Sequence, residues 1–272
     1  MSLRSTCGIV LKISGHGEAD KLVTFYCSDL GRVTGIAKGA KKSNRRFVNK
    51  LEEFSHLHIF YRPPRESSGL FLLSEADLLA SHLSLRTDFQ RYVAAMYLCE
   101  LILRFTRDND PDPRLYALLK WAFSALDHTK APHKIVTLAH LHLLDAAGYR
   151  PEFSRCHSCR QIVESGRTYM FLPETGALLC SSCCPRQEGR SPCLSVQTLR
   201  LLANAQLFDL DRLHRLQFTQ QSLSEAMDTL HYFTLHLLQQ DVHSWKILRS
   251  LVAGHNPSRI PRSITKGNLP LA

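Results

Sequence analysis

Long hydrophobic runs are absent from this sequence, and so is a recognisable secretion signal. No apolar run reaches the ~18 residues that a membrane-spanning helix needs. The first residues, from Met1 to Thr6, lack the apolar core of a signal peptide. The cysteines number nine, and those outside the paired motifs described below follow no disulfide pattern. These absences predict a cytoplasmic protein with no membrane among its partners.

Sequence motifs of the common enzyme classes are missing as well. The chain contains neither H-E-x-x-H nor G-x-S-x-G. His56 and His58 would share one face of a strand, without a carboxylate in metal-site spacing. His140 and His142 lie two apart on a predicted helix, so their side chains diverge. We therefore expect these histidines to be structural and the protein not to be an enzyme.

Two C-x-x-C motifs are the most specific pattern that the sequence does contain. Cys156 and Cys159 form the first, and Cys180 and Cys183 form the second after an interval of twenty residues. This spacing is typical of a closed site in which four thiolates bind one structural zinc ion. A disulfide, a site without metal, and Cys184 in place of Cys183 are the alternatives. Because so short a segment cannot bury a core of its own, metal binding would contribute on the order of 10 kcal/mol to its folding.

The first 80 residues have the composition of β structure. Runs rich in β-branched and aromatic residues alternate with Gly, Pro and Asp breaks. The predicted strands are 7–13, 22–27, 32–37, 57–61 and 70–73. Five short strands over this length favour a small closed barrel of the oligonucleotide-binding (OB) fold, with an SH3-like barrel as the alternative.

The densest positive charge lies between the third and fourth predicted strands. The chain has a formal net charge of +10, and residues 38–50 contain six cations and no acid. Cations on a flexible segment can follow a phosphate backbone, so this segment predicts contact with nucleic acid. An ordinary solvated loop is the alternative. The candidate binding residues are Lys38, Lys41, Lys42, Arg45 and Arg46.

Apolar residues at helical spacing follow the predicted barrel. The predicted helices are 88–105, one beginning at 113, one from 132 to 148, 196–207 and 222–251. Asp112 and Ser195 are N-cap residues for two of them, and Pro113 suits a first helical position.

These elements predict an α+β multidomain fold. Pro173 and Gly176, between the two cysteine motifs, indicate the turn of a β-hairpin. The motifs therefore form a four-cysteine zinc-finger insertion between helices that pack together. The predicted units are a nucleic-acid-binding OB barrel (1–80), an α-helical domain (81–152 and 194–252), the zinc-binding insertion (153–193) and a basic flexible tail (253–272).

Two stretches of the sequence resemble the RecO family of bacterial DNA repair proteins. The first comprises Gly17 to Phe25 and Lys38 to Lys42, in the predicted barrel. The second is Leu143 to Phe153, which runs into the motif Cys156 to Cys159. The order of barrel, basic loop, helices, cysteine insertion and helices is also similar to this family. The resemblance covers residues 1–250.

The resemblance implies a recombination mediator without catalytic turnover. Such proteins bind single- and double-stranded DNA and anneal complementary strands. They act at the nucleoid with RecR and single-strand-binding protein, and they help RecA load at gaps. The family's DNA-binding loop cations and zinc thiolates correspond to the five cations and four cysteines named above.

The resemblance also implies a pocket on the helical domain for the acidic C-terminal tail of single-strand-binding protein. Arg86, Arg91 and Arg104 are candidates for this pocket by charge alone. A zinc-containing nucleic-acid enzyme and an RNA-binding zinc protein are the alternative functions.

Overall fold

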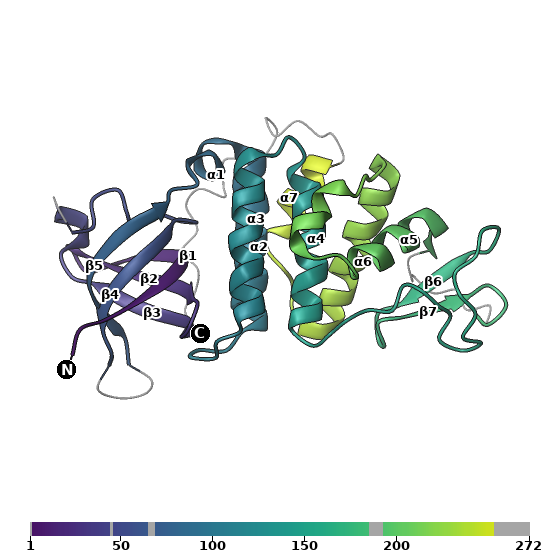
Figure 1. Ribbon diagram of the computed structural model, residues 1–272, viewed down its shortest axis with the longest axis horizontal. Coiled ribbons are helices and arrows are strands. Elements are labelled where there is room, and N and C mark those ends of the chain that lie inside the picture. Colours follow the sequence, from purple (N-terminus) through teal and green to yellow (C-terminus); the bar gives the residue numbers. More distant parts are fainter. Residues whose placement is uncertain (1, 44–45, 65–68, 185–192, 253–272) are drawn as a thin grey trace.

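Five strands close into a barrel at one end of the molecule (Figure 1). The computed structural model describes residues 2–43, 46–64, 69–184 and 193–252. The strands are β1 (Arg4–His16), β2 (Asp20–Cys27), β3 (Gly31–Ala37), β4 (His56–Arg62) and β5 (Phe71–Ala80). Their order is β1-β2-β3-β5-β4, β4 pairs with β1, and β3 and β5 are parallel. This five-stranded barrel confirms the OB fold rather than the SH3-like alternative.

Alternate residues of neighbouring strands fill the barrel interior. Val23, Phe25 and Val33 are buried inside it. Thr24 and Thr34 lie on the outer side of the same strands, because successive side chains of a strand point to opposite faces. All five predicted strands are present. The fifth is longer than predicted, since its second half stays paired with β4 up to residue 80.

The two faces of β1 pack into different cores. Val10 lies in the barrel core, whereas Ile9 and Leu11, on the opposite face, pack into a core shared with the helices. The register with β2 shifts between Val10 and Lys12, and this bulge places Lys12 opposite Thr24 on the outer side of the barrel. One strand thus contributes to two hydrophobic cores.

Seven α-helices follow the barrel in the described part of the chain, and most of them stand between the barrel and a small hairpin (Figure 1). Asp88, Asp112 and Ser195 each cap a helix by accepting a hydrogen bond from a backbone N–H of the first turn. Within the described residues, none of the helices is both long and apolar enough to cross a membrane. The helices are α1 (Leu83–Thr87), α2 (Phe89–Phe105), α3 (Pro113–His128), α4 (Pro132–Ala146), α5 (Val196–Ala205), α6 (Gln220–Leu238) and α7 (Trp245–Val252).

The single helix predicted over 222–251 is wrong, because the chain breaks between α6 and α7. Gln239 adopts a left-handed conformation with φ of 52°. Glu100 of α2 then accepts hydrogen bonds from the backbone N–H groups of His243 and Ser244, at 2.8 and 2.9 Å. Burial raises the pKa of Glu100, but these donors outweigh burial and hold the pKa below its usual value. A carboxylate distant in sequence therefore caps α7, and no Gly or Pro marks the break.

One histidine of each pair makes internal contacts. His140 is fully buried, and its ring nitrogens contact Tyr97 Oη at 3.3 Å and Thr234 Oγ1 at 2.7 Å. Burial lowers the pKa of His140 to about 3, so this ring is neutral near pH 7. His56 contacts Tyr116 Oη at 2.7 Å, across the junction between barrel and helices.

A three-stranded sheet projects from the opposite end of the helices (Figure 1). β6 (Tyr169–Leu172) and β7 (Ala177–Cys180) form a hairpin, and β8 (Cys193–Leu194) pairs with β6. Gly176 has a φ of 65° and donates its N–H to Leu172 O at 2.9 Å. The hairpin turn predicted at residues 173–176 is therefore present.

The barrel meets the helices through a close backbone approach at Gly31. This residue has a φ of 68°, and a Cβ built on it would overlap the backbone carbonyl of Asp110. Beside it, the Asp112 N–H donates to Tyr26 Oη at 3.2 Å. Only glycine satisfies both the conformation and the space.

Replacing Gly31 by alanine should loosen this junction. We expect Gly31→Ala to lower the free energy of unfolding by about 2–3 kcal/mol, because the left-handed conformation and the overlap both carry a cost. Denaturant unfolding measures this change. Gly17→Ala is the matched control, since Gly17 has a φ of 54° but nothing within 4 Å of its built Cβ. Equal losses in the two variants would contradict the role of the close approach.

Candidate metal centre and nucleic-acid interface

The basic segment leaves the barrel after β3 and keeps its cations in solvent. Gly39 has a φ of 70°, and a short 3-10 turn over Ala40–Lys42 follows it. The described cations among the five candidates are all exposed: Lys38, Lys41, Lys42 and Arg46. Arg45 lies outside the described residues.

Main-chain hydrogen bonds fix this turn against the β1–β2 connection. The Gly39 N–H donates to Asp20 Oδ1 at 2.8 Å, and the Lys41 N–H donates to Ala19 O at 2.9 Å. The Lys41 ammonium also donates to Gly17 O at 2.8 Å. Lys41 therefore has a positioning role in addition to its charge.

The other cations of the turn are less engaged. Within the described residues, the Lys38 and Lys42 ammonium groups have no hydrogen-bond or ion-pair partner. The Arg46 guanidinium lies 5.3 Å from the ring centroid of Phe47, which is buried. Sequence patterns do not single out a further exposed cation, Lys12, which the bulge in β1 places on the outer face of the barrel.

The two cysteine motifs converge into one cluster. The sulfur atoms of Cys156, Cys159, Cys180 and Cys183 all lie within 4.8 Å of one another. The hairpin β6–β7 brings the second motif to the first, since Cys180 ends β7. Arg160 has a φ of 61° and closes the first turn by donating its N–H to Cys156 O at 3.0 Å. The cluster takes Cys183 from the second motif, in agreement with the x-x spacing.

Backbone donors favour the thiolate form at the buried end of the cluster. Burial raises the pKa of the Cys156 thiol, but backbone N–H groups of Cys159, Cys180 and Ser158 donate to its sulfur and lower the pKa to about 6 overall. The Cys180 N–H lies 3.4 Å from this sulfur. A thiolate is the form that binds metals, so the four cysteines could hold one metal ion.

The cysteine insertion has no separate core, and its apolar side chains are buried in a core that it shares with the helices. Phe153, Tyr169 and Phe171 are buried in one cluster with residues of α4, α5 and α6. The rings of Phe171 and Phe233 are 5.7 Å apart, edge to face. Burial of apolar side chains therefore stabilises the fold of this module, in addition to any stability that a bound metal contributes.

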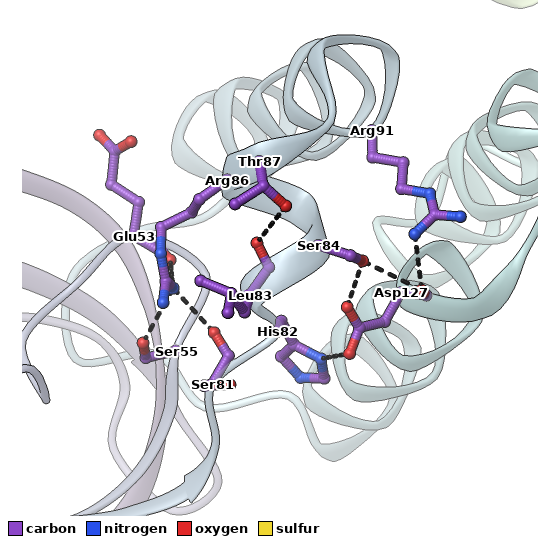
Figure 2. A network of polar contacts seen from close by, with 10 residues as sticks. All are labelled: Glu53, Ser55, Ser81, His82, Leu83, Ser84, Arg86, Thr87, Arg91 and Asp127. Carbon is purple, nitrogen blue, oxygen red and sulfur yellow. Dashed lines mark hydrogen bonds and ion pairs between the residues drawn. The ribbon is translucent and has the colours of Figure 1, made fainter.

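Two of the three arginines considered for an acidic-tail pocket form internal contacts at the start of the helical domain. Figure 2 shows the network. Arg86 donates to Glu53 O at 2.9 Å and to Ser81 O at 2.7 Å, which ties the barrel to the linker before α1. Arg91 donates to Asp127 O at 2.8 Å. Both guanidinium groups are therefore engaged in hydrogen bonds to backbone carbonyl oxygens of this protein.

Arg104, the third of these arginines, is also engaged within the helical domain. It donates to Glu100 Oε1 at 2.9 Å and to Gln240 Oε1 at 2.9 Å. Charge in the sequence does not distinguish such structural arginines from arginines that are available to a ligand.

An OB barrel followed by a helical body with a four-cysteine module defines a multidomain α+β protein. The chain belongs to the RecO family of DNA repair proteins. Residues 1–82 match the family description "Recombination protein O N terminal", and residues 86–246 match "Recombination protein O C terminal".

Relatives named DNA repair protein RecO are similar to this chain over most of its length. The chain is 30% identical to the protein of Syntrophobacter fumaroxidans, over 92% of this chain and 98% of the relative. It is 30% identical to the protein of Syntrophus aciditrophicus, over 89% and 94%. It is 30% identical to the protein of Roseiflexus sp., over 96% and 91%. The resemblance noted in the sequence is therefore confirmed.

Metal analysis tests the cysteine cluster. We expect one metal ion per chain in protein purified without chelator, and a lower content in Cys156→Ser, because this variant removes one of the four ligands. Elemental analysis measures both, and Cys99→Ser is the matched control, since Cys99 is buried in the helical core. Because the module shares its core with the helices, a chelator should loosen the hairpin while helical circular dichroism persists. Metal-free protein, or equal contents in the two variants, would contradict the assignment.

Proposed function

We propose that this protein is a DNA-binding recombination mediator that makes and breaks no covalent bond. It binds single- and double-stranded DNA and anneals complementary strands. The observation that carries the proposal is the turn at residues 38–46, where four described cations are exposed beside an OB barrel. Membership of a DNA repair family supports DNA as the polyanion.

Annealing has a direct electrostatic rationale. Two DNA strands repel each other through their phosphates, and a cationic surface that contacts both reduces that repulsion. The formal net charge of +10 supports such contact beyond the loop itself. Lys38 and Lys42 contact phosphates, together with Arg45 and Arg46, while Lys41 also holds the turn in place.

The partners of this activity are other proteins of recombination. RecR and the acidic C-terminal tail of single-strand-binding protein bind the protein at gaps in DNA, and RecA loads as an indirect result. The family supports this assignment. The protein acts in the cytoplasm, at the nucleoid during repair.

The metal of the cysteine cluster is one structural zinc ion. Four thiolates form the soft, tetrahedral donor set that zinc prefers. A closed site of this kind leaves no position for a reacting water, so the ion would stabilise the insertion and take no part in a reaction. Cys156, Cys159, Cys180 and Cys183 would hold it.

Charge reversal in the basic turn should weaken binding. We expect the double variant Lys38→Glu and Lys42→Glu to lower affinity for single-stranded DNA by roughly ten-fold or more. We also expect it to reduce the slope of log affinity against log salt by about 1.4, since each lost phosphate contact removes about 0.7. Fluorescence anisotropy at several salt concentrations measures both quantities.

The matched control reverses two exposed lysines outside the barrel, Lys130 and Lys246, with the same change in net charge. If both double variants lose affinity equally, net charge rather than the turn governs binding. Unchanged affinity and slope in the Lys38 and Lys42 variant would contradict the turn as the interface.

A strand-annealing assay tests the mediator role. We expect the protein to accelerate annealing of complementary strands coated with single-strand-binding protein, and less so when that protein lacks its acidic tail. The Lys38 and Lys42 variant should be slower, because it screens phosphates less well. The same reactions examine the alternatives: cleaved or deaminated DNA would indicate an enzyme, and stronger competition by RNA than by DNA would indicate an RNA-binding protein.

A further inference from the structure

The outer surface of β1, β2 and β3 is the part of the barrel that adjoins the basic turn. Pairs of residues on neighbouring strands form this surface. Lys12 lies opposite Thr24, and Thr24 lies opposite Thr34. Closer to the turn, Leu22 lies opposite Ile36. We call this surface the strand face. Its members are Lys12, Ser14, Leu22, Thr24, Thr34 and Ile36.

The strand face has no ring on which a base could stack. Among the barrel residues that the structure describes, Tyr26 shares this side of β2 but is 0% exposed beneath the helical body. Phe25 and Phe71 belong to the barrel core instead. His16, at the end of β1, is exposed but lies beyond these six members, where it pairs with Asp20 across the strands. The face therefore presents hydroxyls, aliphatic side chains and lysine.

The half-exposed rings of the barrel lie on a different side, beside acids. His58 and Phe60 on β4 are half-buried and pack against each other at 4.7 Å between centroids. Phe60 lies opposite Glu75 and His58 opposite Asp77 on β5. Lys50 partly neutralises Asp77 at 3.6 Å, whereas Glu75 has no ion-pair partner within the described residues. Carboxylates at this place disfavour a phosphate chain.

We infer that the strand face and the basic turn bind the sugar-phosphate backbone of single-stranded DNA and leave its bases unstacked and free to pair. The inference rests on the proposed function and specifies which part of the DNA is recognised. The contacts to phosphates come from Lys12, Lys38 and Lys42. The hydroxyls of Thr24 and Thr34 lie 3.1 Å apart and make the strand face polar, with no flat ring on which a base could stack. A strand held in this way is presented to its complement with its pairing edges open.

This mode of binding differs from that of OB barrels that stack bases on aromatic side chains. When a base is stacked, its loss costs roughly ten-fold or more in affinity, whereas a backbone contact is indifferent to it. An abasic oligonucleotide keeps its phosphates and has no bases, so it separates the two modes.

The test compares an oligothymidylate with an oligonucleotide of equal length whose central residues are abasic, by anisotropy against the full chain. We expect affinities equal within about two-fold and equal salt slopes, because phosphates supply the binding energy. Lys12→Glu should weaken both oligonucleotides to the same extent. Thymines in the complex should keep their reactivity toward permanganate, which attacks unstacked pyrimidines.

Phe60→Ala examines the half-buried phenylalanine ring on β4. Phe60 is partly exposed on β4, so its truncation should leave the fold and the affinity unchanged. Weaker binding of the abasic oligonucleotide by roughly ten-fold, protection of the thymines, or loss of affinity in Phe60→Ala would each overturn the inference. If neither oligonucleotide binds, the proposed function itself fails, and that outcome is distinct from the others.

Discussion

The basic turn holds several positive side chains close together, although like charges repel each other. The structure achieves this with the main chain, since the Gly39 and Lys41 N–H groups bond to Asp20 and Ala19 of the β1–β2 connection. The ammonium groups of Lys38 and Lys42 remain in solvent, unpaired within the described residues. The turn therefore holds these charges at fixed positions, as the proposed contact with phosphate requires.

Local patterns were sufficient for the features that depend on local chemistry. The five strands, the caps Asp112 and Ser195 and the turn at residues 173–176 all follow from spacing and from residue type. The convergence of the cysteines follows in the same way, because two tight turns joined by a hairpin have few arrangements. The positions of the cations were predictable, but their individual roles were not.

Features that depend on distant partners were not predictable. The break between α6 and α7 is stabilised by Glu100, more than a hundred residues away, and leaves no Gly or Pro in the sequence. The bulge that exposes Lys12 depends on the register with β2 and on a second core that takes Leu11. The core shared by the cysteine module and α6 likewise requires tertiary contacts that spacing does not encode.

The buried ring of Tyr26 limits the path of any DNA strand that binds as proposed. The helical body covers the end of β2 and β3 that carries this ring, so the strand face stops there. If DNA binds as proposed, a strand on this face cannot continue straight past the helices and has to leave the barrel at that point.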